Sequence, residues 1–80
     1  MTKNEFIEHY RPHRYGGLKQ ASLDLFEEIE ETFNEDLDAE TMTSSISYKI
    51  STALEVYSDE LRDRDWLVDM YNDLKKLDLN

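Results

Sequence analysis

The sequence predicts an all-α fold, a small bundle of three main helices with a short helix at the N-terminus. Three stretches of the chain carry apolar residues at spacings of three and four, which places them on one face of a helix. Alternation of apolar and polar residues with a period of two never persists, so the signals for strands are poor. Eighty residues allow one domain with one modest core, and we expect residues 1–80 to form a single acidic helical domain.

The short first helix is predicted over residues 3–10. Thr2 and Glu5 have the spacing of a capping box, and the apolar Phe6 follows them. Residues 11–17 contain a proline, which lacks a backbone donor, and two glycines, which are free to take positive φ. This segment is therefore predicted to be a loop.

The second helix is predicted to begin at Leu18 and to fade between Asn34 and Met42. Asn, Asp, Thr and Ser accumulate in that last segment, and their side chains compete for the backbone hydrogen bonds of a helix. The face that this helix buries is predicted to consist of Leu18, Ser22, Leu25, Phe26, Ile29 and Phe33.

Two further helices are predicted between Thr41 and Leu77. The third follows the capping candidates Thr41, Thr43 and Ser44, and its stripe consists of Ile46, Ile50, Ala53, Leu54, Tyr57 and Leu61. The fourth stripe consists of Trp66, Leu67, Met70, Tyr71, Leu74 and Leu77. The centres of the two stripes differ by roughly 120° on a straight helix, which predicts a break or strong kink near Arg62 to Asp65. A hairpin arm in the Ser- and Thr-rich segment 41–52 is the alternative.

The core is predicted from the same stripes. It comprises Leu18, Leu25, Phe26, Ile29, Phe33, Ile46, Ile50, Leu54, Tyr57, Leu61, Leu67, Met70 and Leu74. Without cysteine, stability must come from packing or from self-association. An apolar stripe that stays uncovered would favour a homodimer, with Trp66 and Tyr71 at its seam.

The sequence predicts no catalytic centre, no cofactor and no metal site. It contains no nucleophile elbow, P-loop, dinucleotide fingerprint or zinc signature. His9 and His13 have the spacing of two ligands on a helix, but Pro12 between them ends that helix. The start of the chain lacks a signal peptide, and no apolar run is long enough to span a membrane. We therefore expect a cytoplasmic protein that works by binding rather than by catalysis.

Charge is the most informative property of the composition. Nineteen acidic residues oppose nine basic ones, which gives a formal net charge of -10. Such an excess repels nucleic acid and anionic membranes and attracts basic protein surfaces. We expect a protein partner, with no direct binding of nucleic acid and no membrane association.

The acidic residues are unevenly distributed along the chain. No Lys or Arg occurs from Gln20 to Glu40, and solubility alone does not require a block of one sign. Seven acids between Asp24 and Asp36 give about one charge per 3 Å of helix, close to the spacing of phosphates along a DNA strand. The candidate partner-binding residues of this run are Asp24, Glu27, Glu28, Glu30, Glu31, Glu35, Asp36, Asp38 and Glu40. A second set in the third and fourth helices adds Glu55, Asp59, Glu60 and Asp63.

In size, lack of cysteine and clustered acidity, the chain resembles small host-takeover proteins of lytic bacteriophages, some of which imitate DNA. The target class that this resemblance implies is the basic nucleoid protein HU, inside the cytoplasm of the bacterial host. The likeness concerns the character of the whole chain, and it assigns no individual residue. The function predicted is inhibition of a basic DNA-binding protein by mimicry of nucleic acid.

One short segment supports a different function. Gln20-Ala21-Ser22-Leu23-Asp24-Leu25-Phe26 resembles the peptide that binds the bacterial sliding clamp, which implies that Gln20 and the pair Leu25 and Phe26 enter the clamp's pocket. That peptide binds in an extended form, whereas these residues lie in a strongly periodic helix. Inhibition of the clamp is one alternative, and a helical regulatory adaptor unrelated to nucleic acid is the other.

Overall fold

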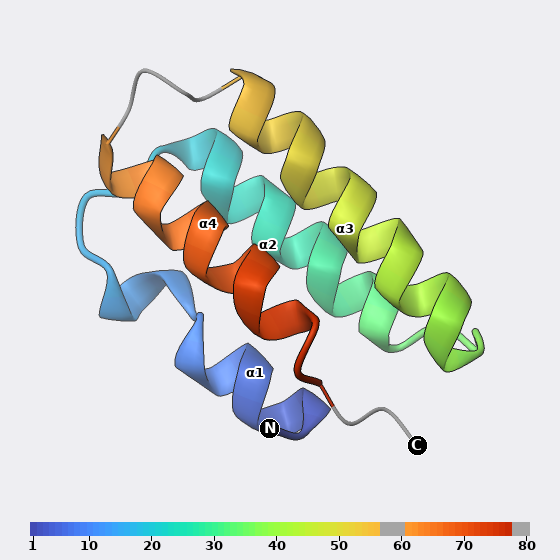
Figure 1. Cartoon of the computed structure of the whole chain (residues 1–80). Coiled ribbons are helices and arrows are strands. Elements are labelled where there is room, and N and C mark those ends of the chain that lie inside the picture. The colour runs from blue at the N-terminus through green and yellow to red at the C-terminus, as the bar shows by residue number, and fades with distance from the viewer. Residues whose placement is uncertain (57–60, 78–80) are drawn as a thin grey trace.

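The protein folds into four helices, seen here in a computed structural model that describes residues 1–56 and 61–77. They are α1 (Lys3–His9), α2 (Gln20–Phe33), α3 (Ala39–Val56) and α4 (Leu61–Leu74), with a short 3-10 helix, η1 (Pro12–Arg14), between α1 and α2. In Figure 1 the three long helices run along one another, and α1 lies beside the lower half of α4. The prediction of an all-α bundle with a short leading helix is confirmed.

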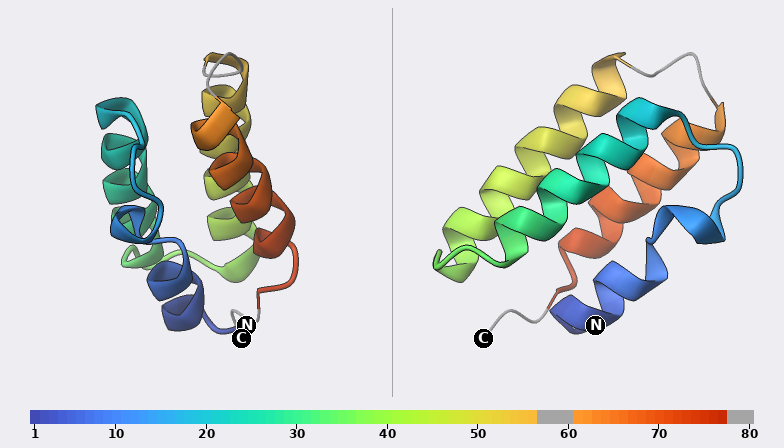
Figure 2. Two further views of the ribbon diagram at one scale, coloured as in Figure 1. Left: turned by 90° about the vertical axis from the view of Figure 1, so that its left-hand side faces the viewer. Right: turned by 180° about the vertical axis from the view of Figure 1, so that it is seen from behind.

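The three long helices form two layers. α3 packs against α4 and α2 packs against α3. In Figure 2, the left view shows α2 apart from the pair α3 and α4, and the right view, from behind, shows α2 nearest the viewer. One face of α2 is therefore directed at the other helices, and the opposite face is the outer surface on that side.

The core lies where the inner faces of these helices meet. Of the predicted core residues, nine are buried: Leu25, Phe26, Ile29, Phe33, Ile46, Ile50, Leu67, Met70 and Leu74. Leu18 and Leu54 are partly buried and pack against them. The prediction of Leu61 as a core residue is wrong, because Leu61 is the first residue of α4 and is 72% exposed. Tyr57 lies outside the described residues.

Helix α1 contributes more to the core than its length suggests. The capping box is confirmed, because the Thr2 hydroxyl accepts from the Glu5 N–H at 3.2 Å and the Glu5 carboxylate accepts from the Thr2 N–H at 3.1 Å. Phe6 is buried with its ring 5.7 Å from that of Phe33. The buried Tyr10 contacts α4 through its hydroxyl, which donates to the Asp69 carbonyl at 3.1 Å. α1 therefore joins α2 to α4.

The pKa of the Tyr10 hydroxyl reflects this position. Burial raises the pKa of Tyr10 above its ordinary value, and the hydrogen bond to the Asp73 carboxylate raises it further. The backbone carbonyl of Tyr10 also accepts from the Trp66 indole N–H at 3.0 Å.

The predicted core did not include five residues that the structure buries: Phe6, Tyr10, Met42, Ala53 and Trp66.

Helix α2 begins at Gln20, two residues later than predicted from Leu18. Lys19 at the N-cap has extended backbone angles and no cap bond from its own side chain. The Asp63 carboxylate of α4 contacts this end of α2 instead, because it accepts from the Lys19 N–H at 3.1 Å and from the Ser22 hydroxyl. Arg62 beside it donates to the Gly16 carbonyl. The first turn of α4 thus fixes the start of α2.

Helix α3 begins earlier than the capping candidates Thr41, Thr43 and Ser44, which all lie inside it. The carboxylate that serves the start of α3 is that of Asp38, which accepts from the Thr41 N–H at 2.8 Å. The alternative of a hairpin arm over 41–52 is wrong, since this segment is helical.

The predicted break between the third and fourth helices is confirmed, but its predicted position near Arg62 to Asp65 is wrong, because these residues lie in the first turns of α4. α3 ends at Val56 and α4 begins at Leu61, and the two helices run in opposite directions, as Figure 1 shows. Within the described residues, no helix is long and apolar enough to cross a membrane.

Candidate partner-binding surface

The outer face of α2 carries four acidic side chains. Asp24, Glu27, Glu28 and Glu31 are all exposed, and at 100° per residue they lie within an arc of about 100°. The buried residues of α2 occupy the opposite side of the helix: Ser22, Leu25, Phe26, Ile29, Thr32 and Phe33. We call the four exposed acids the α2 stripe.

The charge density of the α2 stripe is close to that of DNA. Asp24 and Glu31 are seven residues apart, which is about 10.5 Å of helix axis. Four carboxylates over that length give one charge per about 3.5 Å, compared with about 3.4 Å per phosphate along a DNA strand. The sequence could give the density of acids only for the whole run, whereas the fold places these four on one accessible face.

The α2 stripe destabilises the helix that carries it. Its members are three or four residues apart, a spacing at which like charges repel by about 0.2 to 0.5 kcal/mol per pair. α2 has no acid in its first turn and no base in its last turn, where each would interact favourably with the helix dipole. The stripe therefore persists in spite of an energetic cost to α2.

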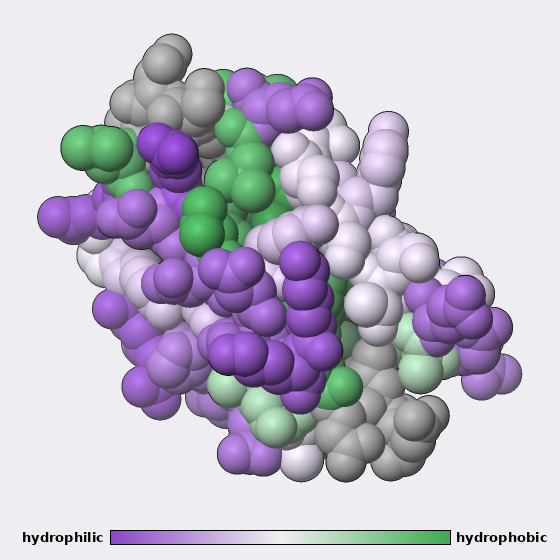
Figure 3. Space-filling model, viewed as in Figure 1, coloured by the Kyte–Doolittle hydropathy of each residue, from purple (hydrophilic) through white to green (hydrophobic). Residues whose placement is uncertain are grey.

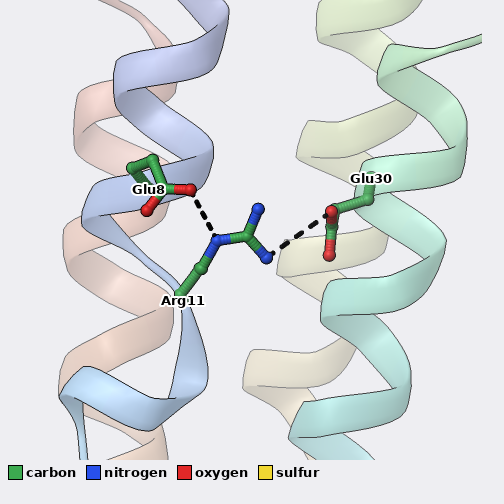
Figure 4. A network of polar contacts seen from close by, with 3 residues as sticks. All are labelled: Glu8, Arg11 and Glu30. Carbon is green, nitrogen blue, oxygen red and sulfur yellow. Dashed lines mark hydrogen bonds and ion pairs between the residues drawn. The ribbon is translucent and has the colours of Figure 1, made fainter.

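Glu30 does not belong to the α2 stripe. It is only partly exposed, and its carboxylate lies 3.9 Å from the Arg11 guanidinium (Figure 4). The Arg11 Nε–H donates to Glu8 at 2.8 Å, and this bond holds the pKa of Glu8 below its ordinary value. Arg11 thus bridges the segment after α1 to α2, and Glu30 is available to a partner only in part.

The acids that follow α2 have mixed roles. Glu35, Asp36 and Glu40 are exposed, as the partner-binding prediction requires. Asp38 is exposed too, but its carboxylate is engaged at the start of α3. The hydrogen bonds from the Thr41 N–H and hydroxyl hold the pKa of Asp38 below its ordinary value.

The second predicted set consists of Glu55, Asp59, Glu60 and Asp63, of which the structure describes Glu55 and Asp63. Glu55 is exposed near the end of α3, whereas Asp63 is only 2% exposed and its carboxylate is taken up by the start of α2. Asp63 is therefore not a partner-binding residue, because burial and its two bonds remove it from the surface. Asp59 and Glu60 lie outside the described residues.

The acidic surfaces do not merge over α3. From Thr41 to Val56 the only charged residues are Lys49 and Glu55, and Ser and Thr dominate. Figure 3, drawn in the view of Figure 1, accordingly shows pale, weakly hydrophilic surface over α3 and strongly hydrophilic surface over α4. Helix α2, which carries the α2 stripe, lies on the other side of the bundle, as the right view of Figure 2 shows.

The segment that resembles the clamp-binding peptide forms the first half of α2. Gln20 is exposed, but Leu25 and Phe26 are buried among the core residues, as the helical periodicity indicates. Neither side chain is accessible to a partner while α2 is folded.

The residues of the predicted dimer seam are also buried, fully or in part. Trp66 is fully buried, and Tyr71 is half-buried with the Lys75 ammonium 4.6 Å from its ring.

A groove between α2 and α3 was not predicted. It has a volume of about 440 Å³ and is lined by Ala21, Asp24, Leu25, Glu28, Tyr48, Lys49, Thr52, Ala53 and Val56. Tyr48 and Val56 are 74% and 67% exposed, although both are apolar side chains. Both residues lie off the apolar stripe predicted for the third helix, and this position was the sequence signal that they would be exposed.

The positions of possible metal ligands can be compared over the described part of the chain. Within residues 1–56 and 61–77, no group of three or more His, Asp or Glu is arranged to hold a metal ion. His9 ends α1 and His13 lies in η1.

Comparison of the chain with protein-family models, with curated proteins and with solved structures gave no match.

Proposed function

We propose that this protein binds a basic DNA-binding protein and competes with nucleic acid for it. The observation that carries the proposal is the α2 stripe, four exposed carboxylates on one face at the linear charge density of a DNA strand. A protein surface that binds phosphates offers Lys and Arg side chains at matching intervals. The α2 stripe presents carboxylates to such a surface in place of phosphates.

The energetics of α2 support a binding role over a role in solubility alone. Solubility is served by charges of both signs distributed over the surface. Here acids of one sign are concentrated on one helix, at spacings that destabilise it. A favourable interaction with a cationic partner would remove that repulsion in the complex.

The proposed target class is a bacterial nucleoid protein such as HU. Its basis is the resemblance in size and acidity to phage proteins that imitate DNA. The protein would then act as an inhibitor inside the host cytoplasm, without enzymatic activity and without a cofactor.

The experiment that tests the proposal is affinity capture from a bacterial lysate over a salt series, followed by DNA competition on the retained protein. We expect a basic DNA-binding protein to be retained at low salt and lost as salt rises, because exposed charge pairs are screened over about 8 to 10 Å. We also expect that partner to release its DNA when this protein is added. A retained partner that keeps its DNA would contradict the proposal and favour a regulatory adaptor.

A further inference from the structure

The groove between α2 and α3 has two properties of a peptide-binding site. Its lining includes two small apolar side chains, Ala21 of α2 and Ala53 of α3. One wall carries the carboxylates of Asp24 and Glu28, which are also members of the α2 stripe. Small side chains permit the close approach of another helix, since packed helix axes are 8 to 10 Å apart.

The opposite wall supplies exposed apolar surface. Tyr48 and Val56 stand at the rim, and they are among the most exposed large apolar residues in the described part of the chain. They are eight residues apart, which is about 12 Å along α3. This length accommodates two to three turns of a partner helix.

We infer that this groove binds an amphipathic helix that has a basic flank, contributed by the protein partner. The inference rests on the proposed function, because it specifies which part of a basic protein would be bound. The mode is that of a helix in a groove, in which apolar anchors give affinity and flanking charges fix the orientation.

The arrangement of charge specifies the occupant. Asp24 and Glu28 are four residues apart, so they lie about 6 Å from each other along α2. Arg or Lys residues four apart on the occupant helix would have the same spacing and face both carboxylates. Leu on the same face of the occupant would then contact the exposed Val56. A second copy of this chain is a poor occupant, since each copy has a formal net charge of -10.

Lys49 gives the inference a distinctive consequence. Its side chain lines the groove together with the two acids, and its charge would repel a cationic occupant. Lys49→Gln should therefore increase affinity for a basic helix by about two- to fivefold, the range of exposed ion pairs. If the groove does not bind a cationic helix, Lys49→Gln should leave the affinity for the basic helix unchanged.

Two synthetic peptides of about 15 residues test the inference. Both carry Arg at positions four apart, and they differ only in the apolar face, which is Leu in one and Ser in the other. The Leu peptide should bind about tenfold or more tightly than the Ser peptide, because burial of one Leu side chain accounts for that difference. Amide chemical shifts should change at Ala21, Thr52 and Val56 in NMR spectra of the titration.

Exposed residues provide matched variants that leave the core intact. Val56→Ser should weaken binding of the Leu peptide by about tenfold, whereas Val68→Ser, an exposed valine of α4, should leave it unchanged. Equal binding of the two peptides, or equal effects of the two substitutions, would overturn the inference. Because the Ser peptide reports on charge alone, its salt-dependent binding to the α2 stripe would still support the proposed function in that case.

Discussion

The carboxylate of Asp63 lies at the junction of α4 with the start of α2. It accepts hydrogen bonds from the Lys19 N–H and the Ser22 hydroxyl while it is only 2% exposed. Asp63→Ala would leave both donors without this acceptor. We expect a loss of about 1 to 3 kcal/mol in the free energy of unfolding, measured by urea denaturation.

Asp65 is the matched control for this substitution. It is an exposed acid two residues further along α4, so Asp65→Ala should change stability by no more than about 0.5 kcal/mol. Similar losses for the two variants would show that Asp63 does not fix the start of α2.

Asp38 predicts a dependence of stability on pH. Hydrogen bonds from Thr41 lower the pKa of Asp38 in the folded chain. Such a carboxyl stabilises the fold above its unfolded pKa and loses that contribution as pH falls through its folded pKa. Asp38→Ala should therefore lower the melting temperature at pH 7, and the difference from the wild type should shrink below about pH 4.

Asp36 is an exposed acid in the same connection between α2 and α3 and serves as the control for Asp38. Asp36→Ala removes the same charge from this connection, and we expect a smaller decrease of the melting temperature at pH 7. A gap between wild type and Asp38→Ala that stays constant down to pH 3 would contradict the role assigned to the ionised carboxylate.

Asp38 and Asp63 also show how far sequence reasoning reaches at the scale of single residues. The sequence predicted a partner-binding role for both acids, and the structure buries Asp63 but leaves Asp38 exposed. The bonds of Asp63 join residues more than 40 positions apart, a pairing that no local pattern contains. The Asp38 bond is local, and the spacing from Asp38 to Thr41 was a readable signal.

At the scale of elements, the apolar stripes predicted the helices better than their ends. The faces of α2 and α3 are recovered because periodicity reflects burial along the whole helix. The starts of both helices were misplaced because each depends on a carboxylate outside the helix. Leu61 was assigned to the stripe of α3, but it begins α4 and is exposed there.

The α2 stripe predicts an opposition between stability and binding. The substitutions Asp24→Asn, Glu27→Gln, Glu28→Gln and Glu31→Gln remove four like-charge spacings. The free energy of unfolding should rise by about 1 to 2 kcal/mol at low salt. Added salt should reduce this gain, since it screens the repulsion in the wild type. A variant that is less stable than the wild type at low salt would contradict the assigned cost of the stripe.

At the scale of the whole molecule, the chain has no cysteine for a disulfide, and Ile50 lies fully buried in the core that stabilises it. Ile50→Ala should cost about 2 to 5 kcal/mol, a large fraction of the stability of so small a domain. Thr52→Ala, at an exposed position of the same helix, is the control and should have little effect. Near-equal urea midpoints for the two variants would contradict the proposed core.

The most direct test of the central claim is displacement of DNA from a basic protein by matched charge variants. Fluorescence anisotropy would follow labelled duplex DNA bound to purified nucleoid protein HU. The stripe variant, with the four substitutions above, is compared with a second set, Asp65→Lys and Asp69→Lys, at two exposed acids of α4. Both sets change the formal net charge of -10 by four, and the second set alters only exposed acids outside the stripe.

We predict that the wild type and the second set release the DNA at similar concentrations. The stripe variant should require about tenfold more protein or greater, because four exposed ion pairs contribute about 1 to 4 kcal/mol. DNA that stays bound at saturating wild-type protein, or equal loss of activity in the two sets, would contradict the claim that the α2 stripe takes the place of a DNA strand.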